Sequence, residues 1–143
     1  MMSLQGSWGI ALFLSLVLVG CQQQQAAPPP EGLQPAVLRI SPAAVGLILE
    51  RQQATSIADP FWVRVSMPPT FDKNKPVYQM EFVPGGPKPT DYAFQADGVL
   101  CLIPKDQVDV FRNCNIDREE RDGAWGFLVT NPNVMGGLPV WMP

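Results

Sequence analysis

Side chains that could bind a metal ion or transfer protons concentrate in residues 113–122. Six residues there carry carboxylate or amide oxygens: Asn113, Asn115, Asp117, Glu119, Glu120 and Asp122. Alternating oxygen ligands are typical of calcium loops, but an EF-hand also needs Gly at its sixth position and Glu at its twelfth, where this chain has Arg118 and Ala124. Arg112 and Arg121 are interleaved with the acids and would partly neutralise them. The sequence therefore favours a solvated, salt-bridged loop without a metal ion.

Residue types that serve in catalysis are sparse. The chain contains no histidine, which removes the side chain that most often acts as general base, proton shuttle or metal ligand. A glycosidase would need two carboxyl groups roughly 5–9.5 Å apart across a cleft, and the acidic residues form only one cluster. No G-x-S-x-G sequence marks a nucleophile. We therefore predict that the protein is not an enzyme, and a hydrolase is the least favoured class.

Residues 61–67 alternate between apolar and other side chains with the period of a β-strand. Trp62 and Arg64 project from the face opposite to the apolar one, which begins at Phe61. Both residue types are enriched among interface hot spots, so Trp62 and Arg64 are predicted to contact a partner. The alternative for Trp62 and for the other strand aromatics is packing in a core between two sheets.

The N-terminal residues 9–20 read GIALFLSLVLVG and carry no charge. A helix of that length spans roughly 18 Å, short of the ~30 Å that a membrane-spanning helix must cross; this is typical of a secretory signal peptide. The sequence LVGC at 18–21 resembles the lipobox of bacterial lipoproteins, in which the cysteine is lipidated. The resemblance implies a signal peptide over residues 1–20, a lipid on Cys21 and, because Gln22 follows it, an outer-membrane address.

Cysteine parity predicts a disulfide bond. With Cys21 lipidated, Cys101 and Cys114 remain as an even pair in an oxidising compartment. A disulfide bond that closes the loop between Cys101 and Cys114 would stabilise the domain by about 3 kcal/mol. Because no C-x-x-C spacing is present to lower a thiol pKa, the predicted Cys101–Cys114 bond is structural.

Composition divides the mature chain into a tether and one domain. Residues 21–35, with the lipidated cysteine at their start, are rich in Gln and Pro and too poor in apolar residues to fold alone. Residues 36–143 suffice for a single domain. Apolar patterning predicts strands in segments 37–40, 61–67, 77–83, 92–95, 99–103, 125–130 and 138–142. A hairpin is expected to join 61–67 to 77–83, and a tight turn at Ala96-Asp97-Gly98 to join the next pair; residues 105–112 suit one helical turn or a strand.

Residues 42–53 allow two interpretations. Ser41 followed by Pro42 suits a helix N-terminus, whereas Gly46 and a block of consecutive apolar residues disfavour a helix and favour a strand. The run LRISPAAVGLIL at 38–49 resembles the opening of bacterial immunoglobulin-like modules, where a Ser-Pro bend joins two strands. The predicted fold is an all-β, antiparallel β-sandwich of immunoglobulin-like type, with at most one short helix.

These features together predict a lipid-anchored outer-membrane protein with a non-catalytic binding or structural role towards a protein partner in the cell envelope. A lipoprotein that binds a small ligand or an envelope polysaccharide is the alternative. The net charge of −3 and the lack of a basic cluster argue against nucleic acid as a partner. No cofactor and no metal ion are expected.

Overall fold

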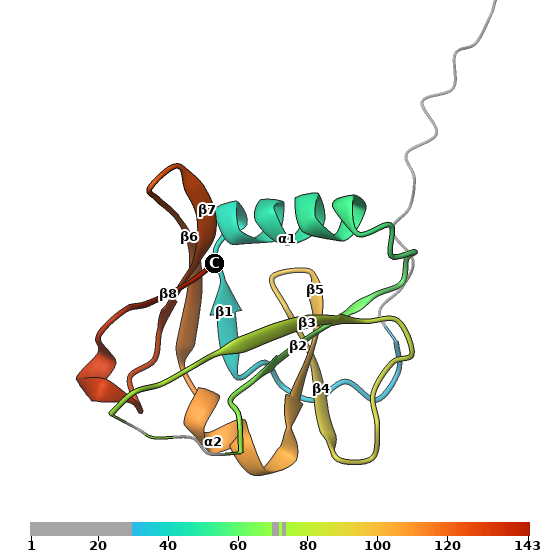
Figure 1. Cartoon of the computed structure of the whole chain (residues 1–143). Helices are drawn as coiled ribbons and strands as arrows, with labels where there is room; N and C mark the ends of the chain where they lie inside the picture. The colour runs from blue at the N-terminus through green and yellow to red at the C-terminus, as the bar shows by residue number, and fades with distance from the viewer. Residues whose placement is uncertain (1–29, 70–71, 73) are drawn as a thin grey trace, which may run out of the picture.

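Two four-stranded mixed sheets and a flanking helix form the folded part of the chain, which the computed structural model describes for residues 30–69, 72 and 74–143 (Figure 1). The β2–β5 sheet has the strand order β3 (Gln79–Val83), β2 (Trp62–Ser66), β5 (Val99–Pro104), β4 (Asp91–Ala96). The β6–β7 sheet has the order β1 (Leu38–Ile40), β6 (Cys114–Arg121), β7 (Ala124–Thr130), β8 (Val140–Met142). The shorter elements are η1 (Lys105–Gln107), α2 (Val108–Phe111) and η2 (Met135–Gly137).

The segment expected to be a strand at 42–53 is the helix α1 (Pro42–Ala54), so the strand prediction is wrong. The hydroxyl of Ser41 accepts a hydrogen bond from the Ala44 amide at 3.1 Å and caps the helix. Ala44, Leu47 and Ile48 are buried at helical spacing. Their burial outweighs the roughly 1 kcal/mol that a glycine such as Gly46 costs in a helix interior.

The predicted all-β, immunoglobulin-like sandwich is also wrong. An antiparallel sandwich contains no parallel pairs, but β1 pairs with β6 and β2 with β5 in parallel. Parallel neighbours need a crossover connection, so strands distant in sequence lie side by side, and α1 lies across one end of the sheets in Figure 1. The architecture is a mixed α and β fold.

Short-range predictions are confirmed. Strands β2 and β3 pair antiparallel with Val63 opposite Phe82, and β4 and β5 are joined by a tight turn in which Asp97 and Gly98 have φ of 49° and 85°. Two positive φ values are typical of the hairpin turn that Asp-Gly favours.

The charged segment 113–122, predicted as a loop, instead lies mostly in β6, because it pairs with β7 along its length.

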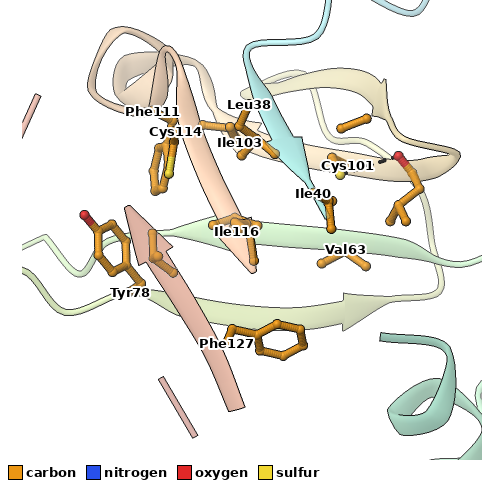
Figure 2. Packing of buried hydrophobic residues seen from close by; sticks show 14 of the residues in the cluster. Leu38, Ile40, Val63, Tyr78, Cys101, Ile103, Phe111, Cys114, Ile116 and Phe127 are labelled. Atoms are coloured by element: carbon orange, nitrogen blue, oxygen red, sulfur yellow. Dashed lines mark hydrogen bonds between the residues drawn. The ribbon is translucent and has the colours of Figure 1, made fainter. Parts of the chain in front are cut away.

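One hydrophobic core lies between the sheets and under α1, as the buried side chains in Figure 2 show. Its largest fully buried side chains include Ile48, Phe94, Ile103, Phe111, Ile116 and Phe127. The chain joins this body before the predicted boundary at residue 36, because the Gln34 amide donates to the Ala93 carbonyl at 2.8 Å.

Candidate functional site

Trp62 does not form the exposed contact that its alternation predicted. It does project from the face of the β2–β5 sheet opposite the main core, yet only 7% of it is exposed. The loop over residues 84–90 folds back over this face, and a methyl group added at Gly86 would lie 3.6 Å from the indole nitrogen. The prediction of partner contact at Trp62 is therefore wrong, because a distant Pro- and Gly-rich loop covers the indole.

Arg64, the second predicted contact residue, is engaged within the domain. Its guanidinium contacts the carboxylates of Asp91 at 2.7 Å and Glu81 at 3.1 Å. Asp91 also accepts from the Lys88 amide at 2.9 Å. Burial acts to raise the pKa of Asp91, but hydrogen bonds from Arg64 and the Lys88 amide hold that pKa below its usual range. Arg64 thus fastens the covering loop to the sheet through Asp91, and its contact with a partner stays a prediction.

The two domain cysteines are free thiols in the structure, which differs from the predicted disulfide bond. Cys101 lies in β5 and Cys114 begins β6, so they belong to different sheets, and both are fully buried. Figure 2 shows both side chains among apolar core residues. Burial raises the pKa of each thiol to about 12. Cys21, the predicted lipidation site, lies outside the described residues, and its lipidation stays a prediction.

The charged strand β6 instead carries two arginines whose guanidinium groups stack on tryptophan rings. The Arg118 guanidinium lies 4.0 Å from the centre of the Trp125 ring, and that of Arg121 lies 5.7 Å from Trp141. Ion pairs tie Arg118 to Glu50 at 3.7 Å and Arg121 to Glu119 at 2.7 Å. We call the residues Arg118 and Trp125 the arginine–tryptophan surface.

The Arg121–Trp141 pair is separate from this surface, because the two stacked pairs lie on opposite faces of the β6–β7 hairpin. Trp125 of β7 lies opposite Glu120 of β6, and Trp141 of β8 lies opposite Leu128 of β7. Leu128 is three residues after Trp125, and side chains an odd number of residues apart on a strand face opposite sides of the sheet. Trp125 is 45% exposed. The sequence pattern singled out Trp62 and not Trp125. The signal for Trp125 is that it lies two residues after the Asp122-Gly123 turn and shortly after a charged run.

Gly126 brings Trp141 close to the hairpin. A methyl group at this position would lie 2.5 Å from the Met142 carbonyl oxygen and 2.7 Å from the Trp141 indole. The indole nitrogen donates to the Glu119 carbonyl at 3.3 Å. The missing side chain at Gly126 therefore makes room for the indole to lie against the backbone.

A groove of about 320 Å³ opens between the edge strands β3 and β8. Arg51 closes it on one side, because its guanidinium donates to the carbonyls of Trp125 at 2.8 Å and Pro143 at 3.2 Å and lies over the Phe127 ring. The groove is lined by Arg51, Tyr78, Gln79, Met80, Phe82, Phe127, Met142 and Pro143. Its walls suit an apolar group, and none of its side chains is a carboxylate or thiol.

Within residues 30–69, 72 and 74–143, no three His, Cys, Asp or Glu side chains come together as a set that could hold a metal ion. In the same part of the chain, none of the helices has both the length and the apolar character needed to cross a membrane. Within the acidic cluster, Arg121 forms a salt bridge with Glu119, whereas Arg118 pairs with Glu50 of α1.

The fold resembles solved structures of iron–sulfur cluster proteins. A crystal structure of IscA with its [2Fe–2S] cluster is 28% identical, covering 67% of this chain and 83% of that one with a TM-score of 0.51. Escherichia coli SufA, described as involved in iron–sulfur cluster biosynthesis, is 19% identical, covering 77% of this chain and all of that one with a TM-score of 0.55. An Aquifex aeolicus protein solved by NMR is 23% identical, covering 73% of this chain and all of that one with a TM-score of 0.54. Neither a protein-family model nor a curated protein matches the sequence.

These likenesses correct the functional prediction. The expected lipid-anchored outer-membrane protein with an envelope-binding role is contradicted, because the similar structures named for a function are iron–sulfur cluster proteins and not envelope lipoproteins. The lipoprotein resemblance covers only about the first 21 residues and carries no information about the domain that follows. The fold of the domain is what these neighbours share with it.

Proposed function

We propose that this protein takes part in iron–sulfur cluster assembly by binding a cluster-bearing protein. The observation that carries the proposal is the likeness to IscA, at 28% identity over 83% of the IscA chain. The SufA and Aquifex aeolicus structures, which are less similar in sequence, support the fold alone.

The arginine–tryptophan surface is where we expect the contact. Arginine and tryptophan are the residue types most enriched in interface hot spots. Trp125 is well placed for this contact, because it is 45% exposed while Arg118 stacks on its ring and holds it in place. A pre-ordered aromatic side chain loses little conformational entropy on binding.

Binding can be measured with IscA that carries its [2Fe–2S] cluster as the probe. The purified full-length chain is mixed with loaded IscA, and the elution of the cluster's visible absorbance is followed by size-exclusion chromatography. We expect the absorbance to move to a larger species. Trp125→Ala should weaken binding at least tenfold, while Gln95→Ala, an exposed substitution on the other sheet, should leave it unchanged.

Two results would count against the proposal. If loaded IscA elutes unchanged at concentrations up to about 100 μM, where a weak transient complex should still be seen, the proposed function is wrong. If binding occurs but Trp125→Ala and Gln95→Ala behave alike, the contact lies elsewhere on the domain.

A further inference from the structure

Holding an iron–sulfur cluster demands cysteines that this domain does not present. Such clusters are held by about four ligands, nearly all of them cysteine thiolates. Each thiol must lose its proton and point at the metal. The chain has three cysteines and no histidine, and the two in the described domain are Cys101 and Cys114.

Cys101 is enclosed by the β2–β5 sheet. Its strand β5 has neighbours on both sides, and Cys101 is in register with Val63 of β2 and Phe94 of β4. The side chain has no exposed surface, and its sulfur contacts the Val99 carbonyl at 3.5 Å. A metal could reach this sulfur only if β5 separated from the core.

Cys114 is enclosed in the same way by the other sheet. It lies in register with Leu38 of β1, has no exposed surface and sits beside Phe111 in Figure 2. Because Cys101 and Cys114 come from different sheets and both belong to the core, exposing them together would require the two sheets to come apart.

Both thiols are also hard to deprotonate, and a cluster ligand must be deprotonated. Burial raises the pKa of both thiols to about 12, so only about one thiol in 10⁵ would be ionised at pH 7. At Cys101 burial outweighs a hydrogen bond with the Ala96 backbone, which lowers the pKa, and the charge of Asp97 raises it further; at Cys114 burial raises the pKa.

We infer that neither Cys101 nor Cys114 ligates an iron–sulfur cluster, and that the cysteines holding any cluster which this protein helps to assemble belong to its protein partner. The second half rests on the proposed function. The domain thus keeps the fold seen in IscA while its own thiols serve as core side chains.

Thiol titration tests the inference on the folded protein. In the full-length Cys21→Ser variant only Cys101 and Cys114 remain, and we expect no reaction with a thiol reagent in native buffer but two thiols per chain after unfolding. Anaerobic incubation with ferrous iron and sulfide, followed by desalting, should leave no iron, sulfide or visible absorbance on this variant. IscA treated in parallel is the positive control.

The inference is overturned if the Cys21→Ser variant retains iron and sulfide and loses them on Cys101→Ala or Cys114→Ala with an unchanged circular dichroism spectrum. Should those alanine variants fail to fold, thiols of the parent variant that react rapidly when native, and become protected by iron and sulfide, would overturn it equally. Neither result depends on IscA binding, so failure of this inference and failure of the proposed function are separate outcomes.

Discussion

Gly126 provides the sharpest test of how β7 and β8 pack. In Gly126→Ala the new methyl group would lie 2.5 Å from the Met142 carbonyl oxygen and 2.7 Å from the Trp141 indole, well inside contact distance. Neither the backbone oxygen nor the packed indole can yield cheaply, so β8 must shift. Overpacking of this kind costs about 1–3 kcal/mol.

Gly46→Ala is the matched control, because the same methyl group meets nothing within 4 Å in the middle of α1. Replacing a helix-interior glycine by alanine stabilises by about 0.5–1 kcal/mol. The two substitutions add identical atoms and should shift stability in opposite directions.

Thermal unfolding followed by far-ultraviolet circular dichroism measures both changes. For a domain of this size each kcal/mol moves the melting temperature by roughly 4–8 °C, so we expect a loss of about 4–24 °C for Gly126→Ala and a gain for Gly46→Ala. A Gly126→Ala protein as stable as wild type would refute the close approach of Trp141 to β7.

Three further predictions concern polar side-chain contacts. Arg64→Met leaves the carboxylate of Asp91 buried without its partner and should destabilise the domain by about 2–4 kcal/mol in chemical denaturation. Folding lowers the pKa of Asp91 from its usual value of 3.8, so the ionised carboxylate stabilises the fold above that pH and loses this effect as the pH falls through the lower folded pKa. The difference in unfolding free energy between wild type and Asp91→Asn should therefore shrink from pH 5 to pH 2.5. A constant difference would contradict this. Ser41→Ala removes the cap on the Ala44 amide and the 2.6 Å bond to Asp117, so we expect a loss of about 1–2 kcal/mol, whereas an unchanged melting temperature would show that the cap is dispensable.

Local patterns predicted the hairpins well. The alternation over residues 61–67 and 77–83 anticipated β2 and β3, and Asp97-Gly98 anticipated the turn between β4 and β5. These features depend on neighbours in sequence, because side-chain period and turn conformation are decided within a few residues. The same local evidence favoured a strand for residues 42–53, where burial of Ala44, Leu47 and Ile48 decides for a helix.

The candidate site required the tertiary structure. Alternation correctly placed Trp62 away from the Phe61 face, but exposure depends on what covers a residue, and the loop that approaches it at Gly86 is distant in sequence. Trp125, by contrast, is 45% exposed although Arg118 stacks on its ring, and its place in the sequence pattern did not show this either.

By itself the sequence determined the absence of histidine, the scarcity of groups that could do catalysis, the strands of the two hairpins and the lipobox-like LVGC at 18–21. Only the tertiary structure decided that strands far apart in sequence pair in parallel, and that Cys101 and Cys114 face the core as separate thiols. The physical reason is the distance along the chain over which the deciding interactions act. Backbone conformation follows from adjacent residues, whereas strand order, burial and the pKa of a thiol follow from contacts between segments that the linear pattern does not specify.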